Sequence, residues 1–344
     1  MSEGLTRRSA LAWGAATAVG AVTGAAAPAT PAAAYRPDGA LSAAGGVPDP
    51  GDQRSEPRPT SRPPAEPPAW QQRIRRVYEA QRARAGGLWH AYVGAFVPGG
   101  ATEPIVADDP NYVIEPASVQ KLAVAAAVLD KVDRGELDLA QRLDVPADIV
   151  LGGSGLFHLQ PVWGDQVTVA HVLAALVVLS DNTAVRLCGQ VAPPAEINAI
   201  LAAKGFQHTR VLPAPEHPTR FYLGETTPRE TTDLLARLAN RTLLSPASTD
   251  LLLTLARSPA GYHDGVRRVM SSAQRARIAV KHGADDHLRH EVGLIFDPAG
   301  APALVFGFFA DGLGDRDNYG ATHPAVQAHA ELGRAMLDAL DEAG

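Results

Sequence analysis

Apolar residues recur with helical spacing over several stretches of the chain. In 118–133, for example, Leu122, Ala126 and Leu129 fall on one face of a helix. The same spacing predicts further helices over 70–85, 168–179, 194–204, 228–240, 248–256 and 324–341. Several of these segments begin with Thr, Pro or Ser, which are typical of a first helical turn. The middle of the chain is therefore predicted to be mostly helical.

Strand-like patterns lie on both sides of this helical middle. They cover 88–97, 104–107, 277–281, 291–296 and 303–310. Strands from both ends of a domain, with helices between them, predict an antiparallel sheet built from the two ends. The predicted fold class is α+β, with helices flanking the antiparallel sheet and an all-helical subdomain beside it.

The N-terminal segment has a different pattern. Arg7 and Arg8 precede a run of Ala, Gly, Val and Thr, and small residues follow at Ala32 and Ala34. Residues 1–34 resemble a twin-arginine (Tat) signal peptide, so we expect a secreted protein with no stable membrane span after cleavage. An uncleaved membrane anchor is the alternative, although the run is weaker than the roughly 20 strongly apolar residues that a spanning helix needs.

The rest of the chain divides by composition. Residues 35–69 are rich in proline, glycine, serine and charge, which predicts an extended linker, whereas 70–344 have the composition of a single globular domain. The formal net charge is −6 and no basic run occurs, which argues against a nucleic-acid partner. The single cysteine cannot form an intramolecular disulfide. We also expect the protein to be a monomer.

A serine and a lysine three residues apart open the helix predicted at 118–133. Ser118 needs a base within hydrogen-bond reach to act as a nucleophile, and Lys121 shares its helical face. Lysine occurs in this chain only at positions 121, 131, 204 and 281, so its place here is informative. Alone, the pair is a weak signal, and a capping serine with a solvated lysine is the alternative.

Two further short motifs have possible chemical roles. The triplet at 180–182, Ser-Asp-Asn, follows an apolar helix and so lies at a buried helix end, in or beside a cleft; a polar turn is the alternative. The triplet at 281–283, Lys-His-Gly, ends a predicted strand, where the lysine can point into a cleft and the glycine admits a substrate close to the backbone.

In their order and spacing, these motifs resemble the Ser-x-x-Lys, Ser-Asp-Asn and Lys-Thr-Gly set of class A β-lactamases and penicillin-binding proteins. The segment 155–160 and the Thr-Thr-Pro at 226–228 also look like the class A pattern, so the resemblance covers about 70–344. It implies a β-lactamase-like fold, with a β-lactam or cell-wall peptide as substrate and no metal or cofactor.

The resemblance implies a role for each matching residue. Ser118 would attack the carbonyl carbon, Lys121 would help to remove its proton, and Ser180 would pass a proton to the leaving nitrogen. Asn182 would hold the substrate amide, and Lys281 would attract the substrate carboxylate. The backbone N–H of Ser118, with a second one from the strand after the third motif, would form an oxyanion hole.

One departure from the family concerns release of the acyl-enzyme. Class A β-lactamases carry a glutamate before the Thr-Thr-Pro helix, where it activates the hydrolytic water. Glu216 lies close to that place, but the Leu-Asn that normally follows is missing. We predict Glu216 as the deacylating base, with a solvated loop carboxylate as the alternative. In that alternative the acyl-enzyme would persist, as in a penicillin-binding protein.

A second departure concerns substrate binding. His282 stands where the family has Thr or Ser, and we predict that it binds substrate together with Gly283 and Arg289. Arg289 lies where the family often keeps a second carboxylate anchor, and a surface arginine is the equal alternative. The His and Asp residues of 282–290 match no common zinc motif, so we expect no metal there.

Three functions remain open from the sequence. The first is a class A-like serine β-lactamase that forms an acyl-enzyme at Ser118. The second is a D,D-peptidase or another penicillin-binding serine acyl hydrolase, which stable labelling by a β-lactam would favour. The third is a non-catalytic exported binding module on the same fold, which a lack of any acylation would favour.

Overall fold

The computed structural model describes residues 66–160 and 164–343. The signal peptide predicted at 1–34 and most of the linker predicted at 35–69 therefore lie outside the described residues. Within the described ranges, no helix is both long and apolar enough to cross a membrane.

The central feature is an antiparallel sheet of five strands in the order β2-β1-β9-β8-β7. Its strands are β1 (Leu88–Phe96), β2 (Thr102–Asp108), β7 (Ile278–Asp285), β8 (Leu288–Phe296) and β9 (Pro302–Asp311). Two strands come from the start of the domain and three from its end, which confirms the sheet predicted from the sequence. The last motif lies on β7, the outermost strand on one side.

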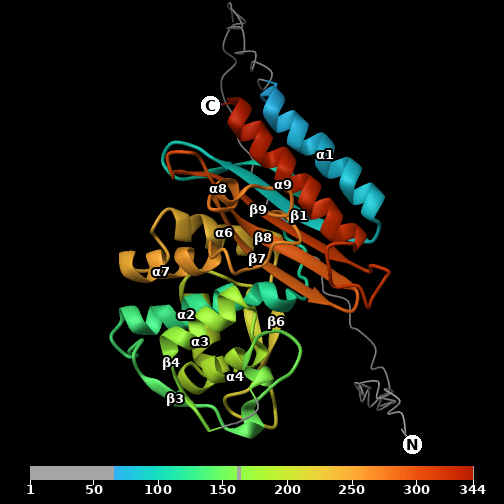
Figure 1. Cartoon of the computed structure of the whole chain (residues 1–344). Helices are drawn as coiled ribbons and strands as arrows, with labels where there is room; N and C mark the ends of the chain where they lie inside the picture. The colour runs from blue at the N-terminus through green and yellow to red at the C-terminus, as the bar shows by residue number, and fades with distance from the viewer. Residues whose placement is uncertain (1–65, 161–163, 344) are drawn as a thin grey trace, which may run out of the picture. The chain divides into compact units, whose positions relative to one another are not determined.

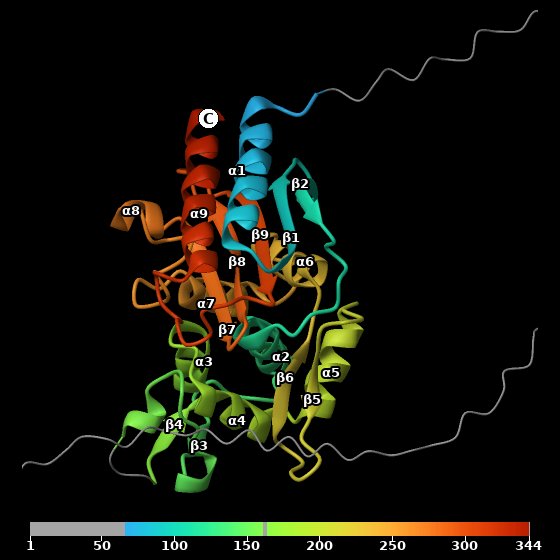
Figure 2. The ribbon, with the colours of Figure 1, turned by 90° about the vertical axis from the view of Figure 1, so that its right-hand side faces the viewer.

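Two helices cover one face of this sheet. The first helix, α1 (Ala69–Ala85), and the last, α9 (Pro324–Ala343), lie side by side across it (Figures 1 and 2). Along β7, Ile278 and Val280 belong to the core beneath these helices, whereas Ala279 belongs to the core on the opposite face. Successive side chains of a strand point to opposite faces, so Lys281 and His282 also point to opposite faces.

The opposite face of the sheet packs against the helical half of the domain. At its centre is α2 (Lys121–Asp133), where every residue from Leu122 to Leu129 is buried because helices surround it. The other helices of this part are α3 (Val169–Val178), α4 (Asn182–Val191), α5 (Pro194–Ala203), α6 (Pro228–Ala239) and α7 (Pro246–Ala256). This arrangement confirms the predicted α+β class with a helical subdomain.

Short elements complete the fold. They are η1 (Ala117–Gln120), η2 (Ala147–Ile149), η3 (Phe157–Leu159), the pair β3 (Arg142–Asp144) and β4 (Gln166–Thr168), the pair β5 (Arg210–Pro213) and β6 (Phe221–Glu225), and α8 (Ser272–Arg275). Most of these pieces are only three or four residues long, too short for a hydrophobic period to reveal them in the sequence.

Two predicted boundaries near the motifs were wrong. The helix expected from residue 118 begins as the 3₁₀ turn η1, and its α-helical part starts only at Lys121. The strand expected to end at Lys281 continues to Asp285, because its hairpin with β8 keeps pairing to Leu288. The third motif therefore lies within an edge strand rather than at its end.

Candidate active site

The turn that carries Ser118 is held from both sides. Before it, Ile114 exchanges backbone hydrogen bonds of 2.9 and 3.0 Å with Thr226. After it, the Gln120 side chain donates to the backbone carbonyls of Arg210 and Glu225. These anchors fix the position of the half-buried Ser118 between the sheet and the β5–β6 hairpin.

Lys121 is fully buried and its amine is surrounded by the second motif. Its Nζ donates to the carbonyl oxygen of Ser180, to Ser180 Oγ at 3.2 Å and to Asn182 Oδ1 at 2.8 Å. Burial lowers the pKa of this amine to about 7, and the Asp181 carboxylate offsets part of that effect. An amine with a pKa near neutrality can accept and return a proton at physiological pH.

Lys281 reaches the same serine from the sheet. Its buried Nζ donates to Ser180 Oγ at 2.9 Å and to the carbonyl oxygen of His282 at 2.8 Å. Burial first, and the neighbouring Lys121 second, lower the pKa of Lys281 well below its usual value. Ser180 itself has a left-handed backbone, with φ at 55°, which holds its hydroxyl between the two amines. Two amines thus share one hydroxyl, which is an arrangement that can move protons.

Asp181 and Asn182 organise the loop at the mouth of the site. The buried Asp181 carboxylate accepts the backbone N–H groups of Leu156 and Phe157 at 2.7 and 3.0 Å, and it also caps α4. Gly155 passes so close that a Cβ there would lie 2.1 Å from Asp181 Oδ2. The Asn182 side chain donates to the Gly152 carbonyl at 3.0 Å. The loop at 152–157 is therefore bound along its length to the second motif.

Gly283 lets the edge strand approach the nucleophile turn. A Cβ at this position would lie 2.7 Å from the Pro116 carbonyl oxygen and 3.0 Å from the Ser118 nitrogen. The Ser118 nitrogen therefore lies next to the outermost strand of the sheet, which is the neighbour that an oxyanion hole built from Ser118 and β7 requires. The geometry brings together Ser118, Lys121, Ser180, Asn182, Lys281 and Gly283, all predicted from the sequence.

Glu216 lies elsewhere. It is exposed in the turn between β5 and β6, and Figure 2 shows this hairpin pointing away from the sheet. The end of the hairpin that contacts the nucleophile turn is the pair Arg210 and Glu225. A β-strand rises about 3.3 Å per residue, so Pro213, the last residue of β5, lies roughly 10 Å from that pair along the strand. Glu216 follows Pro213 and lies farther still. The deacylating role of Glu216 stays a prediction, and this position does not favour it.

His282 points to the opposite face of the sheet from Lys281. Its ring stacks on Tyr262, with ring centroids 3.9 Å apart. Burial and the two nearby lysines lower the pKa of His282 well below 6.5, so the ring is neutral at pH 7. The contact with Tyr262 was not predicted from the sequence, because 20 residues separate the two rings and no motif links them.

Arg289 is buried and directed at backbone carbonyls. Its guanidinium donates to the carbonyl oxygens of Asp285, Leu288, Arg316 and Asn318. These contacts fasten the β7–β8 turn to the connection between β9 and α9. This stabilising role differs from both sequence alternatives, and carboxylate binding by Arg289 stays a prediction.

The histidines and aspartates of 282–290 do not converge. Asp285, Asp286 and His287 are exposed in the hairpin turn, whereas His290 is buried beneath it. In the part of the chain that the structure describes, no group of three or more His, Cys, Asp or Glu side chains could hold a metal ion.

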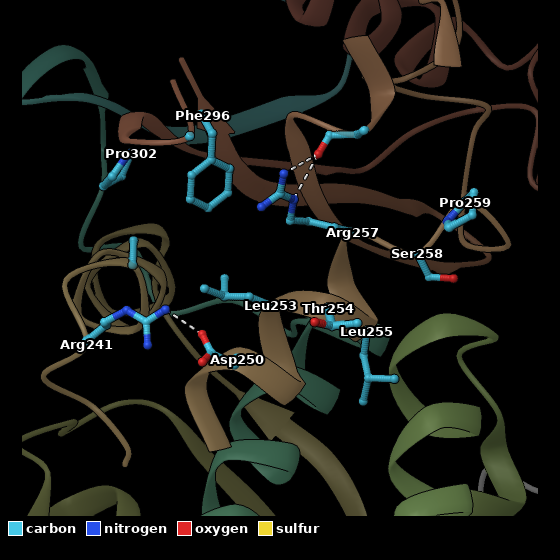
Figure 3. A pocket seen from close by; sticks show the side chains of 13 residues that line it. Arg241, Asp250, Leu253, Thr254, Leu255, Arg257, Ser258, Pro259, Phe296 and Pro302 are labelled. Carbon is cyan, nitrogen blue, oxygen red and sulfur yellow. Dashed lines mark hydrogen bonds and ion pairs between the residues drawn. The ribbon is translucent and has the colours of Figure 1, made fainter. Parts of the chain in front are cut away.

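A cavity of about 730 Å³ lies at the other end of β7. Figure 3 shows Arg257 and Phe296 on one side of it and the ion pair of Arg241 with Asp250 on the other. Its lining, as far as the described residues go, includes none of the site residues above, and it offers no nucleophile paired with a base. The cavity therefore adds no residue to the site at the Ser118 turn.

Known proteins resemble this chain over the whole described domain. A family model described as the β-lactamase enzyme family matches residues 69–340. No curated protein matches the chain. A β-lactamase from Sphaerobacter thermophilus is 24% identical, with a TM-score of 0.65, and the match covers 79% of this chain and 97% of that one.

Two further solved structures give similar values. An ancestral class A β-lactamase is 24% identical, with a TM-score of 0.63 and coverage of 78% and 99%. PBP-A is 20% identical, with a TM-score of 0.63 and coverage of 79% and 96%. One PBP-A variant is described as an acyl-enzyme complex with penicillin G. At these identities the structural likeness shows a shared fold.

Proposed function

Because the chain belongs to the β-lactamase enzyme family, we propose that it is a serine acyl hydrolase of the class A kind that β-lactams acylate at Ser118. The observation that carries this proposal is the meeting of Lys121 and Lys281 at the hydroxyl of Ser180, next to the Ser118 turn. A non-catalytic binding module has no need for two buried amines on one hydroxyl, because burying them costs free energy.

In the proposed acylation, neutral Lys121 takes the proton of the Ser118 hydroxyl as its oxygen attacks the substrate carbonyl. The N–H of Ser118 and an N–H of the β7 edge hold the negative oxygen that forms, an interaction worth about 3 kcal/mol per donor in other acyl transferases. Ser180 then donates its hydroxyl proton to the leaving nitrogen and regains one from Lys121, which returns to its neutral form by giving up the proton it took from Ser118. Lys281, when protonated, attracts a substrate carboxylate.

A second candidate function is supported by the position of Glu216. A class A enzyme needs a carboxylate that activates the hydrolytic water, and Glu216 is exposed in the β5–β6 turn. We therefore expect the acyl-enzyme to be released slowly. This behaviour would be that of a penicillin-binding D,D-peptidase, and it agrees with the description of the PBP-A variant as an acyl-enzyme complex.

Time-resolved intact-mass spectrometry of the full chain with benzylpenicillin tests the proposal. We expect a single covalent adduct that is absent in Ser118→Ala and retained in Ser272→Ala, which removes an exposed serine from α8. Loss of the adduct within seconds would indicate a β-lactamase, and persistence for hours would indicate the peptidase-like function. No adduct on the unmodified chain would contradict the proposal.

We further propose that the protein is exported through the Tat pathway and acts as a monomer outside the cytoplasm. The paired Arg7 and Arg8 support the route, and their replacement by lysine should block export. Unchanged export of the Arg7→Lys, Arg8→Lys variant would contradict it.

A further inference from the structure

His290 is a buried residue of β8 that contacts the chain just before the nucleophile. Its Nε2 lies 2.9 Å from the carbonyl oxygen of Glu115, and its Nδ1 lies 3.1 Å from the backbone nitrogen of Ala310. A backbone N–H can only donate, so Nδ1 must be the acceptor and carry no proton. The neutral ring therefore has its proton on Nε2 and donates it to Glu115.

The surroundings keep His290 in this one state. The ring is 1% exposed and packs against Phe309, with ring centroids 4.9 Å apart. Burial lowers its pKa to about 4, so the ring remains neutral at physiological pH. Both ring nitrogens are thus committed to backbone groups from two distant segments, one in β9 and one before η1.

The segment that His290 binds leads directly into the nucleophile turn. Between Glu115 and Ser118, the backbone of Ala117 adopts a left-handed conformation, with φ at 43°. Such a conformation is unfavourable for alanine and persists only where the surroundings enforce it. His290 holds the chain on one side of this residue. Gly283, which pairs with His290 across the β7–β8 ladder, lies against the backbone on both sides of Ala117, at the Pro116 carbonyl and the Ser118 nitrogen.

We propose that His290 is a positioning residue for the nucleophile. Its hydrogen bond to Glu115 fixes where the left-handed turn begins, and this in turn fixes the Ser118 nitrogen against Gly283 and the direction of the Ser118 hydroxyl at the start of the turn that leads into α2. The residue touches neither substrate nor reacting atoms, so its effect falls on the acylation step rather than on binding. The inference rests on the proposed acylation of Ser118.

Two substitutions in the full chain separate the two hydrogen bonds of the ring. In His290→Gln the longer amide reaches the place of Nε2 and can still donate to Glu115, but the acceptor for Ala310 is lost. In His290→Asn the shorter amide reaches the place of Nδ1 and can still accept from Ala310, but the donor to Glu115 is lost. Each variant therefore leaves one buried backbone group without its ring partner.

We expect His290→Asn to lower the acylation rate constant with benzylpenicillin by roughly 10- to 100-fold, since a displacement of about 1 Å has an effect of that size. The dissociation constant of the non-covalent complex should stay the same. His290→Gln should restore acylation to within about threefold of the unmodified chain. Thermal unfolding of both variants should show similar losses, because each loses one buried hydrogen bond.

Equal acylation losses in the two variants, or a larger loss in His290→Gln, would overturn the positioning role. If His290→Asn does not fold, His290→Gln decides alone, and a loss beyond about threefold in its acylation rate contradicts the inference. A fluorophosphonate, which labels activated serines without a β-lactam ring, separates this inference from the proposed function. If the unmodified chain reacts with neither reagent, both the proposed function and the role of His290 are wrong. If benzylpenicillin labels it and both variants match its rate, only the role of His290 is wrong. If only the fluorophosphonate labels it, acylation by β-lactams is wrong, and the fluorophosphonate rates of the two variants decide the role of His290.

Discussion

The second motif and the β5–β6 turn lie in the same helical half of the domain, but their charged side chains differ in burial and in hydrogen bonding. Around Ser180, the side chains of Lys121, Asp181 and Lys281 are buried and each is hydrogen-bonded. In the β5–β6 turn, Glu216 is exposed to solvent. Under the proposed function, the groups that would acylate Ser118 lie together in a buried network, whereas Glu216, the residue predicted to release the acyl group, lies in an exposed turn.

The largest effect is expected at Lys121, the amine on which acylation depends. Lys121→Met should slow acylation by about 10²- to 10⁴-fold, the usual contribution of a general base. Thermal unfolding should show a moderate loss of stability, because the Ser180 carbonyl and Asn182 Oδ1 lose the donor that Lys121 supplies. The matched control is Lys131→Met on the same helix, which should acylate normally. Normal acylation by Lys121→Met would contradict the account, because it would mean that the buried groups around Ser180 are no more important for catalysis than the exposed β5–β6 turn.

The next effect is expected where β7 meets the nucleophile turn. Gly283→Ala would place a Cβ 2.7 Å from the Pro116 carbonyl and should lower the acylation rate constant by roughly 10- to 100-fold as the turn is displaced. Gly314→Ala is the control, because a Cβ there meets nothing within 4 Å. Stopped-flow acylation of the two variants measures the difference, and equal rates would show that the close approach has no role.

A smaller effect is expected from pH. The pKa of Lys121 is lowered to about 7, and only the neutral amine can accept the proton of Ser118. The acylation rate should therefore rise as pH increases from 6 to 8 and level off above that range, by up to about tenfold in total. The inflection near pH 7 should be absent in Lys121→Met. A rate that falls over this range would mean that the protonated amine is the active form.

The smallest effect is expected in the exposed turn. Glu216→Gln should change the lifetime of the benzylpenicillin adduct by less than about twofold, since a solvated loop carboxylate makes no contact that the amide loses. Intact-mass spectrometry at fixed intervals after mixing measures the lifetime. A large extension of the lifetime would support Glu216 as the deacylating base and would mean that both regions supply groups for the reaction.

The sequence predicted the sheet because its strands follow local patterns. The period of apolar residues placed the strands and long helices. The resemblance of three short motifs to a known family pointed to Ser118, the 180–182 triplet and Lys281, which the fold brings close together. By contrast, the course of 209–225 follows from backbone pairing within a short hairpin and from its packing against η1. No periodicity reports those contacts, so the position of Glu216 could not be foreseen.

The role of His290 was likewise hidden from the sequence. Its two hydrogen bonds go to backbone atoms of Glu115 and Ala310, far from it along the chain in the first case. A hydrogen bond to a backbone atom does not require any particular residue type in the partner, so the sequence does not indicate it. The sequence instead showed His290 only as one of several His and Asp residues at 282–290, for which we expected no metal, because a sequence shows which residues are adjacent but not where their side chains point.

Pre-steady-state hydrolysis of a chromogenic cephalosporin by the full chain tests the contrast between the two regions most directly. If acylation is fast and release is slow, product should appear as a burst equal to the concentration of active Ser118, followed by a much slower steady rate. The Ser118→Ala variant should show neither phase. A linear rapid hydrolysis from the start, without a burst, would contradict the account, because it would mean that release of the acyl group is at least as fast as its formation.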